Sequence, residues 1–442
     1  MRNMTQGSLR GHLLAYAIPT ILGNLLQLTY NAVDSIVVGK LAGDAALAAV
    51  STANPIMNVV ILGVSGISLG ASVLMGRFYG AKDYESLRRE LSTTLLFGFG
   101  CSAAVALAGF FLSRWLLALL AVPAAAMEMA VGYLQIVFFG FLFTFPYNII
   151  AGALRSVGDA KTPVIFLGIS SVLNAGMDVL FVGAFGMSAA GAGLATVLAE
   201  ALSAGLCLLR VYRSQPCLRL GRGQLVLDRA LLGQTLKLGS LTALQQASQP
   251  IGKMLIQRVV NAEGVAAIAA FNAVCRMDDF ACIPAQSIGH GIMACVAQNR
   301  GAGSAARVRE SFRDGLLLSL CYFPIICALT LILKEPFVRL LSPDNRADIV
   351  QAGVGYLSVK AWFFLMPCVL NAIQGYYRGM ARMKVALAAT LIQIAVRTAL
   401  VYLWVPQIGI VGEAWACLAG WLLQFVYEYG IYFRERRRPL CL

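Results

Sequence analysis

The chain has 442 residues, of which 59% are hydrophobic and only 13% carry a charge, and its mean hydropathy is +0.75. Soluble domains contain about 25% charged residues, so this composition excludes a soluble globular protein and indicates a protein embedded in a membrane. A net charge of +14 could indicate nucleic acid as a partner, but 25 of the 35 Lys and Arg residues lie at the termini and at alternate ends of the apolar segments. This asymmetry follows the positive-inside rule, so anionic lipid headgroups are the expected partners and nucleic acid is not.

The apolar segments predict an all-α polytopic membrane protein of twelve transmembrane helices. An even number of spans agrees with basic residues at both chain ends, so we expect both termini in the cytoplasm and the chain in the plasma or inner membrane. Proline residues inside the segments predict kinks at Pro19, Pro146, Pro284 and Pro367. The predicted spans are residues 13–39, 46–76, 91–113, 127–154, 161–183, 189–211, 233–259, 265–297, 314–334, 348–377, 385–405 and 409–432.

Signals for processing and for enzymatic chemistry are weak. The first apolar segment is too long and too polar on one face for a cleavable signal peptide, so it should remain as the first span. The eleven cysteines include no CxxC pair, and we expect neither a disulfide nor a bound metal. His12 and His290 have no nucleophile, metal-ligand or phosphate-loop residues at a suitable spacing. We therefore predict no enzymatic activity and no cofactor; a membrane-embedded enzyme is the alternative of a different class.

An internal repeat divides the chain. The stretch GRFYGAKDYESLRRELSTTL from Gly76 aligns with AQNRGAGSAARVRESFRDGL from Ala297 at an offset of 221, which also pairs Gly43 with Gly264. Two halves of six spans with the same orientation are a design of transporters, in which the substrate lies between or within the halves.

The longest basic, non-apolar segment separates the two repeats. We therefore predict an N-lobe over residues 1–212, a cytoplasmic linker over 213–228 and a C-lobe over 229–442, with the two lobes around a central cavity. The chain is expected to act as a monomer.

The first span carries a charge where charge is costly. An aspartate inside a bilayer costs roughly 2.5 to 3.5 kcal/mol on insertion scales, yet Asp34 lies two thirds of the way along this span. Asn31, Gln27, Asn24 and Thr20 precede it at steps of three and four, so they share its helical face. Such a face must line a wet cavity or a helix interface. The alternatives are an ion or proton site and a structural aspartate paired across helices.

Polar residues in the fifth and sixth spans extend this pattern. Asn174 and Asp178 are four residues apart and share a face, and Thr196 lies among small residues that allow close helix approach. With Asp34 they supply two carboxylates, an amide and a hydroxyl, which suit an alkali cation or a proton relay. An interhelical hydrogen-bond network without an ion is the alternative. Glu200, four residues beyond Thr196, could belong to this face or turn to the membrane surface.

The second half does not copy these residues. At the offset of 221, Leu255 stands at the position of Asp34, and at an offset of 223, which holds further along the chain, Arg397 stands at that of Asn174. A site of this kind is therefore predicted in the first half only. The second half has a stripe formed by Thr242, Gln246, Gln249 and Lys253, and charges at Arg276, Asp278 and Asp279. We expect one of the two acids to pair with Arg276, Lys253 or Arg397. Whether these charges bind substrate is left open.

Several fragments together resemble one family of transporters. They are NAVDSIVVGKLAGDAALAAVS, MGRFYGAKD, GALRSVGDAKTP and LNAGMDVLFV in the first half, and VAQNRGAG and QGYYRGMARMK in the second. Across nearly the whole chain the pattern is similar to the multidrug and toxic compound extrusion (MATE) family. The resemblance implies two six-helix lobes around a central cavity, and export of cationic or amphipathic compounds driven by inward flow of protons or sodium.

The resemblance also implies roles for individual residues. The cation site of the family would fall on Asp34, Asn174, Asp178 and Thr196, with no metal beyond a possible sodium ion, and the hinge of the first helix on Pro19. For the substrate we predict contacts with Gln27, Tyr30, Asn31, Asn148, Met177, Met277 and Asp278. The alternative within transport is a flippase of lipid-linked saccharides, which Lys253, Arg276 and Arg397 would suit because such a cavity must hold a pyrophosphate.

Overall fold

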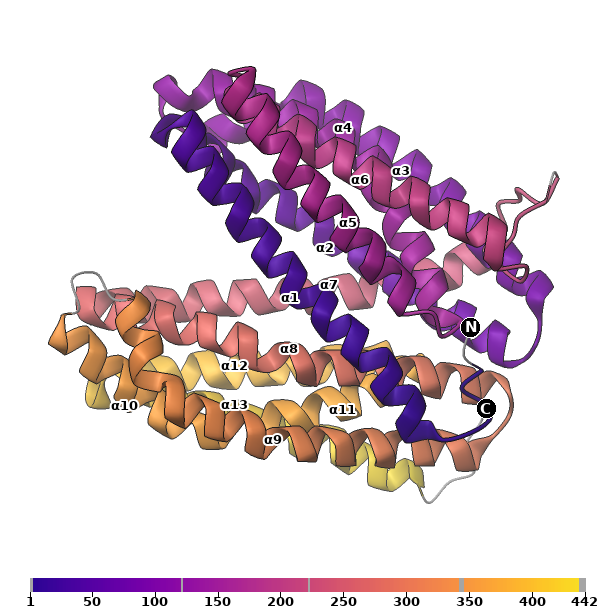
Figure 1. Cartoon of the computed structure of the whole chain (residues 1–442). Helices are drawn as coiled ribbons and strands as arrows, with labels where there is room; N and C mark the ends of the chain where they lie inside the picture. The colour runs from indigo at the N-terminus through magenta and orange to yellow at the C-terminus, as the bar shows by residue number, and fades with distance from the viewer. Residues whose placement is uncertain (1–2, 121, 222, 342–345, 437–442) are drawn as a thin grey trace. The chain divides into compact units, whose positions relative to one another are not determined.

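The computed structural model describes residues 3–120, 122–221, 223–341 and 346–436, and of residues 31, 32, 35, 44, 45, 124, 125 and 341 it describes the backbone alone. These residues form helices and no strands, which confirms the all-α fold (Figure 1). The helices are α1 (Leu9–Ala42), α2 (Asp44–Gly80), α3 (Tyr84–Leu119), α4 (Ala124–Ser156), α5 (Lys161–Asp178), the π-helical turn η1 (Val179–Ala184), α6 (Ser188–Ser214), α7 (Arg229–Ala262), α8 (Val265–Gly301), α9 (Ala305–Leu341), α10 (Ala347–Phe363), α11 (Leu365–Gly379), α12 (Met383–Ile408) and α13 (Val411–Arg436).

Length and composition qualify nine of the described helices as membrane spans, or ten when the bent pair α10 and α11 counts as one. The predicted number of twelve is not reached by this criterion, because α7 and α13 fall below it. Both helices carry polar residues that are buried in protein, among them Thr242 and Gln245 in α7 and Glu428 in α13. Such residues lower the hydropathy of a helix without exposing a polar group to lipid.

Two of the predicted spans are interrupted. The span expected at 348–377 is divided at Phe364 into α10 and α11, which meet at a bend of 45°. Pro367 lies in the first turn of α11, where the missing N–H of a proline costs nothing, so the kink expected near Pro367 is present. The span expected at 161–183 changes from an α-helix to a π-helical turn after Asp178.

The internal repeat is visible in the backbone. Residues with a left-handed φ angle occur at matching positions in the two halves, and mark the same turns between helices. Two pairs keep the offset of 221: Gly43 (82°) with Gly264 (96°), and Lys82 (59°) with Gly303 (70°). Two further pairs keep an offset of 223: Gly158 (84°) with Ala381 (56°), and Gly186 (67°) with Gly409 (68°). The predicted repeat is thereby confirmed.

The chain forms two compact units. The N-terminal unit contains Pro19–Ala243, and the C-terminal unit contains Met4–Ile18 together with the described residues from Leu244 onward. The chain passes from one unit to the other within α1, at Ile18 and Pro19, and again within α7, at Ala243 and Leu244. Each of these two helices therefore contributes residues to both units.

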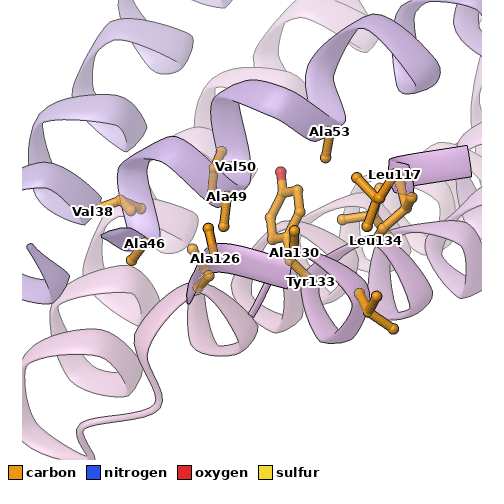
Figure 2. Close-up of a cluster of buried hydrophobic side chains, with 14 of the residues drawn as sticks. Val38, Ala46, Ala49, Val50, Ala53, Leu117, Ala126, Ala130, Tyr133 and Leu134 are labelled. Carbon is orange, nitrogen blue, oxygen red and sulfur yellow. The ribbon is translucent and has the colours of Figure 1, made fainter. Parts of the chain in front are cut away.

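Small residues set the packing of the N-terminal unit. Ala46, Ala49 and Ala53 recur at steps of three and four along α2 and are fully buried, and Ala130 of α4 belongs to the same hydrophobic cluster (Figure 2). Small side chains allow neighbouring helices to approach closely, which is a main source of packing energy in a membrane. α4 lies at the centre of this unit, packed against α2, α3 and α6.

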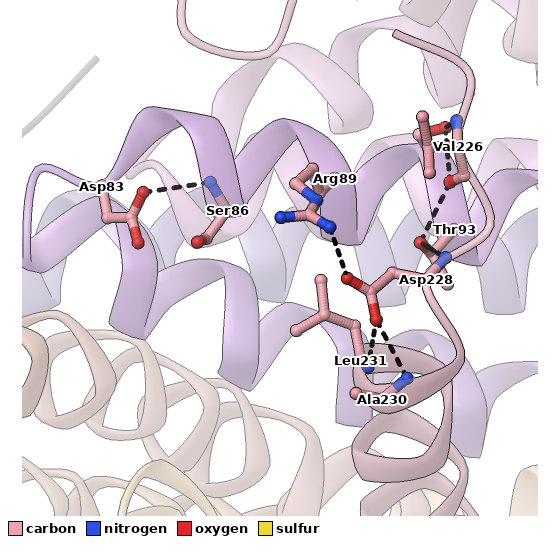
Figure 3. A network of polar contacts seen from close by, with 9 residues as sticks. Asp83, Ser86, Arg89, Thr93, Val226, Asp228, Ala230 and Leu231 are labelled. Carbon is pink, nitrogen blue, oxygen red and sulfur yellow. Dashed lines mark hydrogen bonds and ion pairs between the residues drawn. The ribbon is translucent and has the colours of Figure 1, made fainter.

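The segment before α7 is fastened to α3 (Figure 3). The hydroxyls of Ser92 and Thr93 each donate to the carbonyl of Val226 at 3.1 Å, and each accepts a backbone N–H, from Val226 at 2.8 Å and from Asp228 at 2.9 Å. Asp228 forms an ion pair with Arg89 at 2.9 Å and caps the first turn of α7. The backbone N–H and C=O groups of Val226 and the N–H of Asp228 therefore have hydrogen-bond partners within the protein.

Candidate cation and substrate site

The predicted polar face of α1 is only partly buried. Thr20 is buried, Asn24 and Tyr30 are half-buried, and Gln27 is exposed. The side chain of Asn31 lies outside the described part of the chain. The Tyr30 hydroxyl donates to Thr196 Oγ1 on α6 at 3.4 Å, which places the second half of this face against α6.

Asn174 and Asp178 lie one turn apart at the end of α5, and are 1% and 0% exposed. Asp178 is the last residue before the π-helical turn η1; π-helical turns that interrupt α-helices are frequently found at functional sites. The carboxyl groups of Asp34 and Asp178 lie close enough to act on each other electrostatically. The structure therefore brings together the two acids that the sequence predicts for one site.

Several polar atoms at this site have no protein partner among the described residues. They are both oxygens of the Asp178 carboxyl, both polar atoms of the Asn174 amide, and Oδ1 of Asp34. A buried polar group without a hydrogen bond costs about 1 to 3 kcal/mol, and more when it is charged. Native structures meet that cost with water or an ion. Carboxylate, amide and hydroxyl oxygens are suitable ligands for a hard monovalent cation, and a carboxylate can instead take up a proton.

A third acid joins the site from α6. Glu200 accepts a hydrogen bond from the Thr144 hydroxyl on α4, so its carboxyl points into the helix bundle. The sequence alone leaves this orientation open. Asn148 lies one turn beyond Thr144 and donates to the Thr144 carbonyl at 2.8 Å. Tyr133, also on α4, is buried, and Asp34, Asp178 and Glu200 all act on it electrostatically. Sequence reasoning missed Tyr133 and Thr144, because neither stands out from the other polar residues of an apolar span.

The three remaining residues predicted to contact the substrate make no contact with this cluster of polar groups that the structure records. Met177 is half-buried on α5. Met277 is buried in the hydrophobic core of the C-terminal unit, and Asp278 of the same unit forms an ion pair with Lys360 at 2.5 Å. Contact of these residues with a substrate stays a prediction.

The charges inside the C-terminal unit pair with one another. Asp279 binds Lys253 at 3.1 Å, which confirms the expectation that one acid of the Asp278–Asp279 pair has such a partner. Lys360, only 1% exposed, lies 2.5 Å from Asp278 and 3.7 Å from Glu413. Glu413 in turn pairs with Arg397. Sequence reasoning missed Lys360 and Glu413 as partners, although a lysine and a glutamate inside apolar helices are the signal that could have found them.

Two repeats of membrane-spanning helices, with a half-buried and a buried acid on facing helices of the first, define a membrane transporter. The MatE family model matches residues 19–180 and, again, residues 242–403, two stretches that start 223 residues apart. The chain belongs to this family of multidrug and toxic compound extrusion transporters. The double match also supports the internal repeat.

Relatives with assigned names cover nearly the whole chain. A probable multidrug resistance protein of Bacillus subtilis, YpnP, is 31% identical over 92% of this chain and 92% of its own. The probable multidrug resistance protein NorM of Thermotoga maritima is 24% identical over 92% of this chain and 88% of its own. A protein of Shewanella oneidensis named as an FAD transporter is 24% identical over 85% of this chain and 84% of its own.

Solved structures share the fold. A multidrug resistance MATE transporter of the MOP superfamily, in an outward-facing conformation, has a TM-score of 0.90 at 19% identity over 98% of this chain and 97% of its own. The Vibrio cholerae MATE transporter VcmN, as a mutant in which one aspartate is replaced by asparagine, also has a TM-score of 0.90, at 20% identity over 99% of both chains.

Proposed function

We propose that this chain is a secondary active multidrug antiporter, which exports cationic or amphipathic compounds in exchange for protons or sodium ions. The observation that carries the proposal is the Asp34–Asp178 pair, held on facing helices with buried oxygens that no described protein group satisfies. Names of multidrug resistance proteins among the relatives support the class of cargo. Two acids without a cationic partner favour a positively charged ligand, because each negative charge in a low dielectric requires compensation.

In the proposed cycle the coupling cation and the cargo compete for the N-terminal unit. Occupancy of Asp34 and Asp178 removes the repulsion between their carboxylates and changes how α1 packs against α5. Pro19 is the residue of α1 at which the chain enters the N-terminal unit, and a proline within a helix removes one backbone hydrogen bond. We propose that α1 bends at Pro19 when the cation binds, and that the bend expels the cargo.

The flippase alternative requires free basic groups for a pyrophosphate. Of the three residues that suit such a role, Arg397 is paired with Glu413, and Lys253 with Asp279. Two of the three basic charges are thus compensated within the protein, and only Arg276 has no ion pair among the described residues, which favours export of a cation over binding of a polyanion.

Asp34→Asn tests the proposal because it removes a titratable charge and keeps the size of the side chain. Proteoliposomes loaded with a fluorescent cation would be assayed under a pH gradient and, separately, under a sodium gradient. We expect the wild-type chain to export the dye under one of the two gradients and the variant to lose this ion-driven export. The matched control is Glu128→Gln, which removes an exposed acid paired with Arg114. Export by Asp34→Asn at the wild-type rate would exclude the proposed site.

The proposal includes the location of the chain. We propose that it resides in the plasma or inner membrane as a monomer with both termini in the cytoplasm, since the basic residues gather at those span ends. A fluorescent protein fused to the C-terminus should fluoresce, whereas alkaline phosphatase fused there should stay inactive. An active phosphatase fusion would reverse the assigned orientation.

A further inference from the structure

Glu200 is a half-buried acid that the family motif leaves without a role. It lies one turn beyond Thr196 on α6, and Thr196 accepts the hydrogen bond of Tyr30. Gly140 of α4 makes room for this face of α6: a Cβ atom there would lie 2.7 Å from Val197 Cγ2 and 3.6 Å from Glu200 Oε2. The close approach of α4 and α6 at Gly140 brings the Glu200 carboxyl to the Thr144 hydroxyl.

The Thr144 hydroxyl has two acceptors and one proton. It is placed to donate to Glu200 Oε2 and also to the carbonyl of Gly140, at 3.2 Å. A hydroxyl donates one hydrogen bond and can accept others. When Glu200 is ionised, Thr144 can donate to the carboxylate. When Glu200 is protonated, its O–H can donate to Thr144, which then donates to Gly140. The same geometry thus satisfies both protonation states of the acid.

Glu200 shares its neighbours with the two aspartates. Asp34, Asp178 and Glu200 all act electrostatically on Tyr30 of α1 and Tyr133 of α4, and Glu200 also acts on Tyr147 of α4. α2 contributes charged residues only near its ends, Asp44 and Arg77.

None of the three carboxyls forms an ion pair within the described part of the chain. A carboxylate in a low dielectric without a cationic partner carries an uncompensated charge, which protonation removes. One monovalent cation at Asp34 and Asp178 cannot compensate all three.

We propose that Glu200 is a second proton-exchanging carboxyl of the transport cycle, distinct from the Asp34–Asp178 pair. Its reaction is a proton transfer: the carboxylate takes a proton from water, forming one O–H bond, and later returns that proton to water. The inference rests on the proposed antiport function and adds to it that the N-terminal unit exchanges a proton at Glu200 even when the coupling cation occupies the aspartates.

The first test follows the acid itself. Infrared difference spectra of the full chain in lipid nanodiscs, recorded along a pH titration, report the C=O band of protonated carboxyl groups. We expect a titrating component that is absent from Glu200→Gln and retained in Glu200→Asp and in Glu128→Gln. Spectra of Glu200→Gln identical to the wild type at every pH would overturn the proposal, because Glu200 would then remain in one state.

The second test links that state to transport. Dye export would be measured in proteoliposomes across a pH series, and we expect Glu200→Gln to flatten the pH profile, while Glu200→Asp restores it. A titrating band combined with an unchanged profile of Glu200→Gln would overturn the role in transport. Should Glu200→Gln not fold, Thr144→Val removes the hydrogen bond, and Thr144→Ser is its control. Thr144→Val should shift the infrared band of Glu200, and an unshifted band would refute the pairing.

The outcomes separate this inference from the function on which it rests. If Asp34→Asn abolishes export but Glu200→Gln changes neither the band nor the profile, only the second proton site is refuted. If Asp34→Asn exports normally, the proposed antiport site itself fails.

Discussion

The buried charges of the C-terminal unit give the sharpest prediction about stability. Asp278, Lys360, Glu413 and Arg397 form a chain of two acids and two bases. Glu413→Gln leaves Lys360 paired with Asp278, but it removes from Arg397 the only acid that pairs with it among the described residues. An arginine cannot lose its proton in a protein. We therefore expect a cost of about 3 to 5 kcal/mol, the range for one broken member of a buried pair.

The reverse substitution should cost less. Arg397→Met leaves Glu413, which can become neutral by binding a proton and still has Lys360 at 3.7 Å. The double variant Glu413→Gln/Arg397→Met removes one charge of each sign, and the Lys360–Asp278 pair remains neutral. Removing both partners of a buried pair is often neutral or stabilising, so the double variant should be more stable than Glu413→Gln alone.

Thermal unfolding of the three purified variants in one detergent, followed by circular dichroism, measures these differences, and dye export is assayed in parallel. The reasoning predicts the order wild type, Arg397→Met, Glu413→Gln for decreasing stability, with recovery in the double variant. A Glu413→Gln variant that melts like the wild type and yet loses export would refute a structural role and assign these charges to transport.

Three further predictions concern the N-terminal unit. Gly70→Ala should destabilise it by about 1 to 3 kcal/mol, because the new Cβ would lie 2.7 Å from the backbone nitrogen of Gly239, whereas Gly63→Ala on the same helix meets nothing within 4 Å and should melt like the wild type. Asp83→Ala should cost about 0.5 to 2 kcal/mol, since Asp83 caps α3 by accepting the Ser86 N–H at 3.0 Å. Hydrogen bonds from the side chain and backbone of Ser86 lower the pKa of Asp83. The stabilisation by Asp83 should therefore be present at neutral pH and be lost as the pH falls below about 4, the pKa of an aspartate in an unfolded chain. A series of melting curves against pH that shows no such loss would contradict this. Ser92→Ala combined with Thr93→Val should release the segment around Val226 and speed tryptic cleavage at Arg219, and an unchanged digestion rate would argue against the fastening of this segment to α3.

The likeness of this chain to the aspartate-to-asparagine mutant of VcmN concerns the fold alone, at 20% identity. The role of Asp34 in this chain depends on its own surroundings, which are the Asp178 carboxyl and the nearby phenol of Tyr30. Asp34→Asn therefore has to be tested in this protein.

The sequence by itself determined the membrane character, the helical segments, the repeat and the presence of acids in the first half. These features follow from local rules: each apolar segment must satisfy its backbone within its own helix, and a polar residue is visible wherever it interrupts such a segment. The pairing of Asn174 with Asp178 was predictable for the same reason, because a spacing of four residues within one helix fixes a shared face.

Only the tertiary structure decided which side chains meet across helices. Glu200 reaches Thr144 because Gly140 lets α4 and α6 approach closely, and Lys360 meets Asp278 and Glu413 because α8, α10 and α13 pack together. The depth and rotation of one helix against another depend on the summed packing of many side chains, which no single segment encodes. The passage of α1 and α7 between the two units is likewise a property of the packed chain.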